Sequence, residues 1–520
     1  MKHVLYHEDA RQKLSEGINI LADAVKVTLG PRGRTALIQS PFGSPVLTKD
    51  GVTVAEAIQV EEVFQNIGVQ FIKEVALQTN QVVGDGTTTA TVLAQSMLSN
   101  GLRMITAGAN PVKVKRGIDK AVKALVEGLK ELATPVKSKQ HTAQVGTIAA
   151  NNDATIGNLI AEAMELVGRN GVITVEDSQT VTTDFVHVKG MQFDSGYTSP
   201  YFVTDHEQMD VTFENPRVLL TNEKISSIPQ ILPILEKVAK ARVPLLILAE
   251  NVEGEALATL LVNKLRGTLN CAVVKAPGYG DLRKEMLKDI AALTGAELIS
   301  DETGLKLENT SLESLGTAGK VHITRDKTTL VGGVGQEEEI ERRLNHISRA
   351  IEASESEYDV QKLKERHAKL AGGVAVIRVG APTETELKEK KYRVEDALAA
   401  TRAAVEEGIV AGGGTALINL LPLLNELKVS DEDEALGVKV VRLAIQAPLR
   451  VIADNSGAEG AVIVENVKSL QPGIGYDAAI GDYVCMITEG IVDPAKVVRV
   501  ALQNAASVAT MVITSEAVIG

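Results

Sequence analysis

A short segment rich in glycine and threonine, residues 84–89 (GDGTTT), holds the residue types best suited to chemistry, and a helical pattern follows it directly. Its two glycines allow the backbone to approach a ligand closely, and three threonine amides and hydroxyls at a helix N-terminus favour an anion. Asp85 in such a loop suits a Mg²⁺ ion that bridges phosphate oxygens. The segment therefore indicates a phosphate-binding loop, while an ordinary turn before a threonine-capped helix stays the alternative.

Three further loops carry glycine beside polar residues, at 28–33 (TLGPRG), 47–53 (LTKDGVT) and 411–415 (AGGGT). Each could be a plain turn or a part of the same site. The sequence lacks the GxxxxGK[ST] and GxGxxG nucleotide motifs, the HExxH zinc motif and the GxSxG nucleophile motif. The eight histidines are scattered without metal-ligand spacing. Any nucleotide site in this chain must therefore be of another kind.

Length, charge and cysteine usage limit the class of protein. A chain of 520 residues exceeds one compact core, so about two to four domains are expected. A formal net charge of −13 argues against nucleic acid as a partner, because phosphate binding needs a basic face. Cys271 and Cys485 match neither a disulfide framework nor a zinc site, so we expect buried or incidental thiols. The polar N-terminal segment and the lack of an apolar run of about 18 residues predict a cytoplasmic protein with no membrane segment.

The two ends of the chain resemble each other, and the middle differs from both. Apolar residues at three- and four-residue spacing predict long helices at 12–29, 64–132, 386–425 and 433–520. The middle contains short β-type runs: VITVED, VHVKG, PLLILAE, CAVVKAP and KVHITRD. These runs alternate with helical segments at 229–241, 253–266 and 281–294, which is an α/β pattern. We therefore predict a helical domain built from both ends, with an α/β domain inserted into it.

Glycines mark the junctions of the middle region, with Gly190 on entry and Gly372-Gly373 on exit. They are candidate hinges, and ordinary turns are the alternative. The charge-rich segment 337–370 predicts a solvated helical hairpin that breaks near Tyr358-Asp359.

Seven motifs occur in order across residues 28–499: TLGPRG, LTKDGVTVAEAI, VGDGTTTATVLAQ, KAPGYGDLRKEML, LAGGVAVIRVGAPTE, RVEDALAATRAAVEEGIVAGGGTAL and IVDPAKVVR. Together they resemble the bacterial group I chaperonins over essentially the whole chain. The resemblance implies a multidomain fold of α and α/β parts: a discontinuous, mostly helical equatorial domain, a small intermediate hinge domain and an inserted α/β apical domain. The implied boundaries are 1–132 and 408–520 (equatorial), 133–189 and 375–407 (intermediate), and 190–374 (apical).

The resemblance also implies an ATPase that uses ATP with Mg²⁺ and K⁺. Asp85 would hold the Mg²⁺ ion, while Asp50 and Asp396 would position and activate the attacking water. The residues expected to bind the nucleotide are Thr28, Leu29, Gly30, Pro31, Lys49, Asp85, Gly86, Thr87, Thr88, Thr89, Gly413, Asp477, Ala478, Ala479 and Asp493.

By the same resemblance, apolar side chains of the apical domain would be exposed to bind non-native polypeptides. Helical spacing alone predicts a buried stripe at Leu257, Leu260, Leu261 and Leu265. The resemblance favours exposure instead, because promiscuous binding of unfolded chains needs an open apolar groove. The expected contact residues are Tyr197, Tyr201, Phe202, Leu232, Leu235, Leu257, Leu261 and Val262.

Members of the group I family form seven-membered rings, stacked back to back and closed by a small co-chaperonin lid. We therefore expect a homo-oligomer of seven-membered rings, in two rings, with that lid as a partner. The expected function is an ATP-dependent folding chaperone that captures non-native polypeptides and encloses them in the ring cavity.

Two residues depart from the family pattern. Ser195 stands where many members carry an Arg that pairs across subunits with a Glu, here Glu384, and Asp477 replaces a common Asn of the nucleotide pocket. These departures motivate a first alternative, a specialised paralogue that acts mainly as a holdase or scaffold with weak ATPase activity. A second alternative is a small-molecule phosphotransferase that uses GDGTTT as its phosphate cradle. It is disfavoured because no second substrate pocket with polar catalytic groups can be identified in the sequence.

Overall fold

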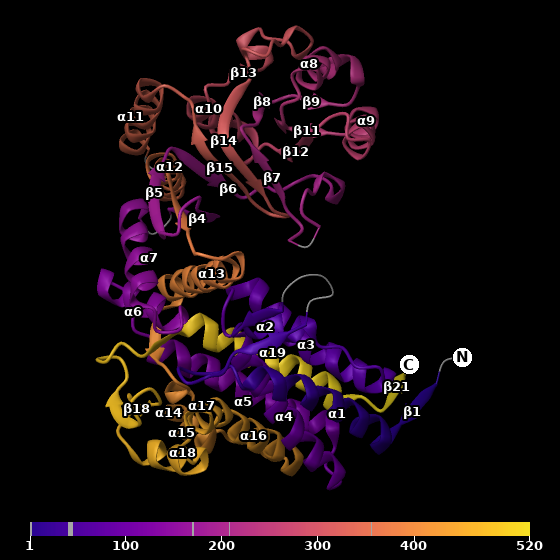
Figure 1. Ribbon diagram of the computed structural model, residues 1–520, viewed down its shortest axis with the longest axis vertical. Helices are drawn as coiled ribbons and strands as arrows, with labels where there is room; N and C mark the ends of the chain where they lie inside the picture. The colour runs from indigo at the N-terminus through magenta and orange to yellow at the C-terminus, as the bar shows by residue number, and fades with distance from the viewer. Residues whose placement is uncertain (1–2, 40–44, 169–170, 207, 355) are drawn as a thin grey trace. The chain divides into compact units, whose positions relative to one another are not determined.

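The computed structural model describes residues 3–39, 45–168, 171–206, 208–354 and 356–520, and the chain forms two compact units (Figure 1). Unit 1 comprises Met1–Glu162, Asp177–Thr183 and Val379–Gly520, and unit 2 comprises Ala163–Glu176 and Asp184–Arg378. Both ends of the chain thus build one unit and the middle builds the other, as the sequence pattern indicates. A further division into three domains is finer than these two units and stays a prediction.

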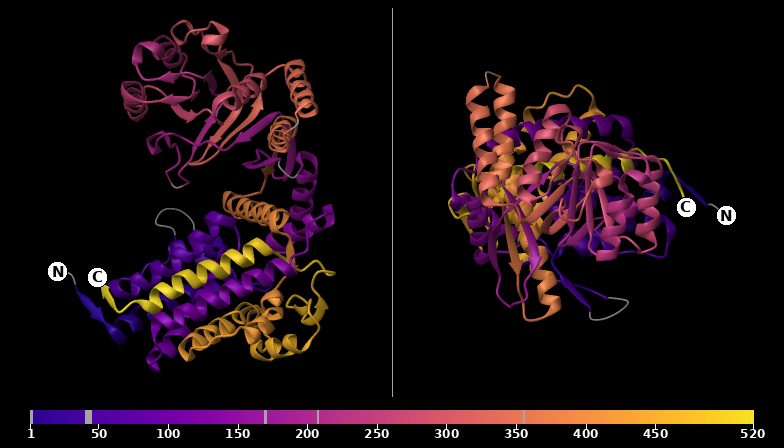
Figure 2. Two further views of the ribbon diagram at one scale, coloured as in Figure 1. Left: turned by 180° about the vertical axis from the view of Figure 1, so that it is seen from behind. Right: turned by 90° about the horizontal axis from the view of Figure 1, so that it is seen from above.

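Unit 1 is built around long helices whose apolar faces pack together. Its central helix, α19 (Ala495–Thr514), packs against α4, α5 and α3 (Figure 2). Alanine, valine, leucine and isoleucine fill this core, because small and branched side chains let helices approach closely where aromatic residues are scarce. The surrounding helices are α1 (His7–Lys26), α3 (Val63–Val83), α4 (Thr87–Thr106) and α5 (Pro111–Leu132).

Helix α1 begins five residues earlier and ends three residues earlier than the predicted segment 12–29. Its first turn carries Glu8 and Asp9, whose charges favour a helix N-terminus but do not contribute to the apolar spacing. The apolar pattern therefore missed the polar first turn of the helix and continued three residues past its end.

Helix α19 is the one helix among the described residues that is long and apolar enough to cross a membrane by length and composition. Thirteen of its residues are buried inside unit 1, where they contact neighbouring helices. Burial on several faces accounts for this composition, because a helix at the centre of a core is apolar almost all round.

The remaining helices of unit 1 are shorter, and small antiparallel strand pairs lie between them. The helices are α2 (Gly51–Ala57), α6 (Lys139–Ala149), α13 (Glu384–Glu407), α14 (Thr415–Asn419), α15 (Leu421–Glu426), α16 (Glu432–Ala444), α17 (Ala447–Ser456) and α18 (Gly460–Ser469). The strand pairs are β1 (Val4–Tyr6) with β21 (Ala517–Ile519), β2 (Ala36–Ile38) with β3 (Val46–Thr48), β17 (Ile409–Ala411) with β20 (Val492–Pro494), and β18 (Ile474–Asp477) with β19 (Asp482–Cys485). Helix α7 (Ala154–Val167) carries the chain from unit 1 into unit 2.

Unit 2 contains an eight-stranded mixed sheet with helices, which confirms the α/β pattern of the middle region. The main strand order is β12-β10-β8-β14-β15-β6, while β13 pairs with β8 and β7 pairs with β14. All five residues of β10 are buried, as expected for a strand near the centre of a covered sheet. The strands are β6 (Gly190–Phe193), β7 (Val211–Glu214), β8 (Arg217–Thr221), β10 (Leu245–Ala249), β12 (Cys271–Lys275), β13 (Leu298–Ile299), β14 (Gly316–Ile323) and β15 (Thr328–Gly333).

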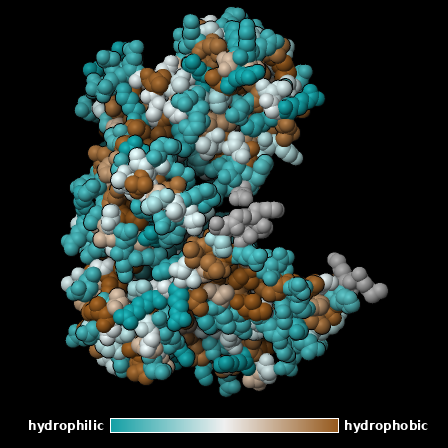
Figure 3. Space-filling view, in the orientation of Figure 1, coloured by the Kyte–Doolittle hydropathy of each residue, from teal (hydrophilic) through white to brown (hydrophobic). Residues whose placement is uncertain are grey.

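Three helices of unit 2 lie where helical segments were predicted, at α8 (Ile228–Ala241), α9 (Gly254–Leu265) and α10 (Gly280–Thr294). A short parallel pair, β9 (Lys224–Ile225) and β11 (Asn251–Val252), accompanies them. On the face drawn in Figure 3, hydrophobic residues lie in small groups among hydrophilic ones.

A second sheet of three strands has the order β4 (Val172–Asp177), β16 (Val374–Val379) and β5 (Asp184–Val188). Gly373 precedes β16 with a φ of +62°, and a Cβ at this position would lie 2.7 Å from the carbonyl oxygen of Val188. Only glycine suits both the backbone angle and this close approach. The hinge role of this glycine stays a prediction.

The charge-rich segment forms the predicted helical hairpin, with α11 (Glu337–Ala353) packed beside α12 (Glu357–Ala371) (Figure 2). The predicted break near Tyr358-Asp359 is wrong, because both residues lie in the first turn of α12. The hydroxyl oxygen of Ser356 caps that helix by accepting a hydrogen bond from the Asp359 amide. A serine cap therefore fixes the start of the second helix a few residues earlier.

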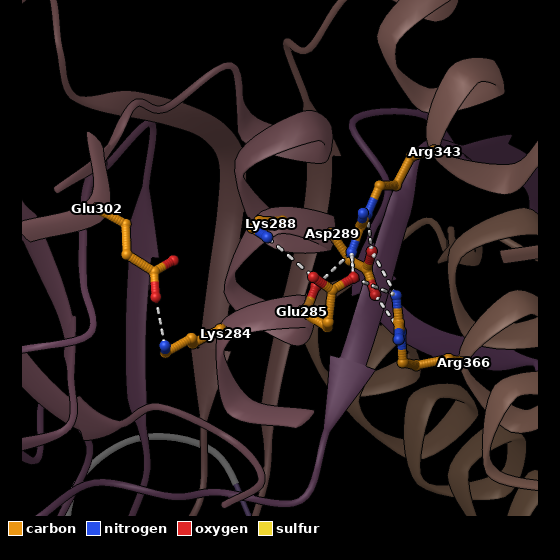
Figure 4. Close-up of polar contacts among 7 residues, drawn as sticks. All are labelled: Lys284, Glu285, Lys288, Asp289, Glu302, Arg343 and Arg366. Carbon is orange, nitrogen blue, oxygen red and sulfur yellow. Dashed lines mark hydrogen bonds and ion pairs between the residues drawn. The ribbon is translucent and has the colours of Figure 1, made fainter. Parts of the chain in front are cut away.

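A buried ionic cluster attaches this hairpin to α10 (Figure 4). Asp289 of α10 is 1% exposed and accepts from the guanidinium groups of Arg343 on α11, at 2.5 Å, and Arg366 on α12, at 2.6 Å. Glu285 lies one turn away on α10 and pairs with Arg343 and Lys288. Burial acts to raise the pKa of Glu285, but hydrogen bonds from Lys288 and Arg343 outweigh it and lower the pKa to about 2. One acidic face of α10 thus holds both helices of the hairpin.

Candidate functional site

Unit 1 contains a cavity of about 280 Å³ at the loops that were singled out in the sequence. It collects residues from segments that lie far apart along the chain, between Thr28 and Val498. Fourteen of the fifteen predicted nucleotide residues line it, together with Asp50 and Asp396. These fourteen are Thr28, Leu29, Gly30, Pro31, Lys49, Asp85, Gly86, Thr87, Thr88, Thr89, Gly413, Asp477, Ala478 and Asp493.

Ala479 is the predicted residue that does not line the cavity. Its carbonyl oxygen accepts a hydrogen bond from Arg32 Nη2 at 2.8 Å, and its amide donates to Asp477 Oδ1 at 2.8 Å. The structure therefore gives Ala479 a place in the turn behind Asp477 and not in the cavity wall.

The N-terminus of α4 opens into this cavity without a cap. Gly86 stands at the N-cap position in a left-handed conformation, with a φ of +77°, and has no side chain that could accept from the first amides of the helix. Within the described ranges of the chain, the amides of Thr87, Thr88 and Thr89 have no hydrogen-bond acceptor. Free amides at the positive end of a 20-residue helix dipole are a binding site for an anionic group such as phosphate.

The loop before α2 meets the N-terminus of α4 at the same end of the cavity. Asp50 caps α2, because its carboxylate accepts from the amides of Val52, at 3.2 Å, and Thr53, at 2.8 Å. The hydroxyl of Thr53 also donates to Asp50, at 2.6 Å. These contacts fix the orientation of the Asp50 carboxylate beside the threonines of α4.

Asp50, Asp85, Asp396 and Asp493 line one cavity together with the carboxylates of Glu389 and Asp477, and Lys49 and Arg393 line it as well. Loss of solvation raises the pKa of Asp85 to about 6 and that of Asp493 to about 7, and neighbouring carboxylates add to both effects. Loss of solvation, followed by the charges of Asp50 and Asp85, raises the pKa of Asp396 well above its usual range. Negative charge is thus concentrated here, and a bound cation would relieve the repulsion.

The described residues include no group of three or more His, Cys, Asp or Glu side chains placed to hold a metal ion. One oxygen of Asp85 accepts from the Gly86 amide at 2.5 Å, and the other has no donor among the residues that the structure describes. Mg²⁺ commonly takes one or two protein carboxylates and completes its shell with water and substrate phosphates. The residues present fit a cation of that kind bound together with a phosphate.

Helix α13 closes one side of the cavity with Glu389, Tyr392, Arg393 and Asp396. Arg393 pairs with Glu389 of its own helix at 2.8 Å and with Asp153, just after α6, at 3.6 Å. The guanidinium therefore links α13 to the α6 end, and this helix positions Asp396 at the cavity.

Several cavity residues had no signal in the sequence. Asn151 and Asn152 follow α6 with positive φ values of 58° and 65°, in a left-handed conformation that asparagine tolerates well. Their neighbours Ile148 and Ala149 also line the cavity, as do Tyr392, Tyr476, Ile452 and Met486. The Asn-Asn pair after a helical segment was the one sequence signal that could have indicated a helix end at the site.

The predicted polypeptide-binding residues of unit 2 divide into three groups by exposure. Tyr201, Leu232 and Val262 are exposed, at 63%, 43% and 44%. Tyr197, Leu257 and Leu261 are half-buried and pack against the unit 2 core. The expected exposure of Phe202 and Leu235 is wrong, because these side chains are 0% and 7% exposed and belong to the core. The apolar surface around α8, α9 and residues 200–202 is therefore smaller than predicted.

Neither cysteine lines the cavity, and neither do Ser195 and Glu384. Cys271 is buried in β12, and burial raises the pKa of its thiol to about 12, whereas Cys485 is exposed. Ser195 donates a hydrogen bond to the Lys275 carbonyl oxygen at 2.7 Å. Glu384 pairs with Lys388 one turn along α13, at 2.9 Å.

The site is a cavity with an uncapped helix N-terminus, clustered carboxylates and a lysine, on a helical unit with an α/β unit inserted into its chain. This combination defines a candidate site for a phosphate-bearing ligand and a cation. A model of the TCP-1/cpn60 chaperonin family matches residues 21–520. The chain therefore belongs to the TCP-1/cpn60 chaperonin family. The match is to the family as a whole, so the bacterial group I branch stays a prediction.

Proposed function

We propose that this chain is an ATP-dependent folding chaperone that couples ATP hydrolysis to the capture and enclosure of non-native polypeptides. Family members are generally ATPases that form rings and act on polypeptides, which supports the class of activity. The observation that carries the proposal is the free N-terminus of α4, which lines a single cavity with Asp50, Asp85, Asp396 and Asp493. Hydrolysis of a nucleoside triphosphate needs groups that bind the phosphates and a residue that positions the attacking water, and this cavity offers candidates for both.

In this proposal the α4 amides and the threonine hydroxyls bind the phosphates, and Lys49 neutralises part of their charge. Asp85 would hold Mg²⁺, which when bound supplies positive charge to the phosphates. K⁺ stays an expectation of the family resemblance. At the other end of the cavity, Ile452, Tyr476 and Met486 offer an apolar surface beside Asp477, which suits a nucleobase.

For hydrolysis, Asp50 and Asp396 would act on the water that attacks the terminal phosphate. Asp50 is held by its cap contacts to α2, so its free lone pairs have a fixed direction for a water molecule. The raised pKa of Asp396 makes this carboxylate a better proton acceptor than an ordinary aspartate. The proton of the water would pass to Asp396 as the new bond to the terminal phosphorus forms, while the bond from that phosphorus to the bridging oxygen breaks and the nucleoside diphosphate leaves.

Polypeptide capture would use the exposed side chains of Tyr201, Leu232 and Val262, with Tyr197, Leu257 and Leu261 at the edge of the same surface. Each contact is weak, and repetition of the surface around a ring would give avidity. We further propose a seven-membered ring, present as two rings, with a small co-chaperonin lid and a cytoplasmic location. Light scattering that gives a stable monomer at micromolar concentration would contradict the ring.

A second candidate is a holdase or scaffold with weak ATPase activity, which Ser195 favours because its hydroxyl cannot replace a charged partner for Glu384. The test is ATP turnover measured with and without an unfolded polypeptide, in the absence of a small-molecule acceptor. The folding chaperone predicts steady hydrolysis that the polypeptide stimulates. Polypeptide binding with almost no hydrolysis would support the holdase instead, and hydrolysis that requires a small acceptor would support a phosphotransferase.

A further inference from the structure

The cavity-facing side of α13 carries an aromatic residue, Tyr392, beside the charged residues of this helix. Glu389, Tyr392, Arg393 and Asp396 all line the cavity, and their three- and four-residue spacing places them on one face of the helix. Glu389 and Arg393 pair with each other, and Arg393 also reaches Asp153. Tyr392 lies one turn before Asp396 and takes no part in this pairing.

Tyr392 lies at the phosphate end of the cavity. Helix α13 packs against β3, the strand that leads into Lys49 and Asp50. Loss of solvation raises the pKa of Tyr392, and the negative charges of Glu395 and Asp50 raise it further, so Asp50 is close enough to act on the phenol. The next residue, Gly51, approaches Thr88 of α4 directly. These neighbours place the phenol near the expected terminal phosphate and away from the apolar end at Tyr476.

The Tyr392 hydroxyl is available to a ligand. The side chain is 43% exposed although it lines the cavity, and its hydroxyl has no hydrogen-bond partner among the residues that the structure describes. Loss of solvation, Glu395 and Asp50 raise the pKa of the phenol and Lys388 and Lys391 lower it, with a net increase, so the phenol stays protonated and can donate a hydrogen bond without adding charge. A donor of this kind suits an anionic oxygen that enters the cavity with a cation.

We propose that the Tyr392 hydroxyl donates a hydrogen bond to the terminal phosphate of a bound nucleoside triphosphate. This inference rests on the proposed ATPase function and adds a residue that distinguishes a triphosphate from a diphosphate. Because Tyr392 and Asp396 share one face of α13, the contact would hold the helix that carries the catalytic carboxylate against a triphosphate. Loss of the terminal phosphate would release this contact, so the position of α13 would report the state of the nucleotide.

The test is nucleotide binding by calorimetry, with a non-hydrolysable ATP analogue and with ADP, each with Mg²⁺, on the full chain in its assembled form. Tyr392→Phe removes only the hydroxyl. A hydrogen bond to a charged group predicts a loss of at least about tenfold in affinity for the ATP analogue, with the ADP affinity unchanged. Tyr358→Phe is the control, because Tyr358 is an exposed tyrosine on α12 in unit 2 that does not line the cavity.

The readout is the ratio of the affinity for the ATP analogue to the affinity for ADP. This ratio separates a lost contact to the terminal phosphate from a general loss of nucleotide binding. If Tyr392→Phe keeps the parental ratio of ATP-analogue to ADP affinity, or weakens both nucleotides equally, the inference is overturned while the proposed ATPase stands. If the parent binds neither nucleotide, the proposed function fails and this inference fails with it. A selective loss for the ATP analogue in Tyr392→Phe, absent in Tyr358→Phe, supports the contact.

Discussion

The backbone of Gly51 lies directly against Thr88, so that a Cβ at Gly51 would fall 2.3 Å from Thr88 Oγ1. The same atom would lie 2.8 Å from Thr87 Oγ1 and 3.1 Å from the Thr88 amide nitrogen. A side chain at this position must therefore displace the threonines that begin α4. This contact joins the loop of Lys49 and Asp50 to the phosphate end of the cavity.

Gly51→Ala should therefore weaken nucleotide binding by at least about tenfold, because loss of one hydrogen bond to a charged phosphate has about that effect. Calorimetric titration with ADP and Mg²⁺ measures the change. Gly319→Ala is a matched control in unit 2, since a Cβ there would lie 3.4 Å from its nearest neighbour, an ordinary contact. Unchanged affinity in Gly51→Ala would show that the first turn of α4 does not bind the phosphates.

The buried cluster around Asp289 predicts a large loss of stability when its acidic centre is removed. Asp289→Asn leaves the guanidinium groups of Arg343 and Arg366 buried without their full counter-charge. Breaking a buried pair in this way costs about 3–5 kcal/mol. Denaturant unfolding of the full chain should show an earlier transition for the unit that contains α10–α12.

Glu339→Gln is the control for this cluster, because Glu339 forms an exposed pair with Arg342 on the same hairpin. Exposed pairs contribute about 0–1 kcal/mol, so the unfolding midpoint should hardly move. If the two substitutions shifted the unfolding midpoint equally, burial of the Asp289 cluster would not explain its contribution to stability.

The nucleotide-free protein should become less stable as the pH rises from about 4 to about 7. Loss of solvation raises the pKa of Asp493 to about 7 in the folded chain, whereas an aspartate in the unfolded chain titrates near 4. Within this window the folded state binds a proton that the unfolded state has lost, so the free energy of unfolding falls as pH increases. For Asp493 the fall amounts to at most roughly 4 kcal/mol.

Thermal unfolding across this pH range, without nucleotide or divalent metal, measures the effect. Asp493→Asn should make the decrease smaller, because an amide does not ionise, while Asp85 and Asp396, whose pKa values are also raised, keep the remainder. Asp326→Asn, at an exposed turn of unit 2, is the control and should keep the parental pH dependence. A variant Asp493→Asn with the parental slope would show that other groups cause the decrease.

Client capture should depend on the exposed part of the apolar surface of unit 2. Tyr201→Glu places a charge where an unfolded chain would lie, and the desolvation cost of about 1–3 kcal/mol per site repeats around a ring. Binding of a denatured polypeptide should be lost, while ATP hydrolysis continues. Tyr358→Glu is the control, because Tyr358 is a similarly exposed tyrosine of α12, and this variant should bind the polypeptide normally. If both variants lost polypeptide binding, the added charge itself, and not its position on the apolar surface, would be the cause.

The helices of unit 1 could be predicted from the sequence because one face of each must be apolar, and that spacing is visible in the residues. The cavity was harder to predict. Tyr392 and Asn151 lie in segments whose patterns are explained by helix packing and a helix end, and only the folded chain brings them to the same cavity as Asp85. No local sequence pattern shows that residues so far apart along the chain line one cavity.

The sequence also did not predict which apolar residues of unit 2 are buried and which are exposed. Phe202 and Tyr201 are adjacent apolar residues, yet Phe202 is fully buried and Tyr201 is 63% exposed. A short 3₁₀ helix at Pro200–Phe202, capped by Ser199, turns the two side chains in different directions. A hydrophobic residue fits a core and a binding groove equally well, so the type of residue alone could not separate them.

The most direct test of the account compares Asp396→Ala with Asp85→Ala in a nucleotide titration and a single-turnover hydrolysis assay. Asp396→Ala removes a group that acts only on the water, so ATP affinity should stay near the parental value. Hydrolysis should slow by about 10²–10⁴-fold, the usual contribution of a positioned base. Asp85→Ala should weaken binding itself, because it removes the carboxylate that would hold Mg²⁺ beside the phosphates. Parental hydrolysis in Asp396→Ala, or a loss of affinity as severe as in Asp85→Ala, would contradict the proposed ATPase mechanism.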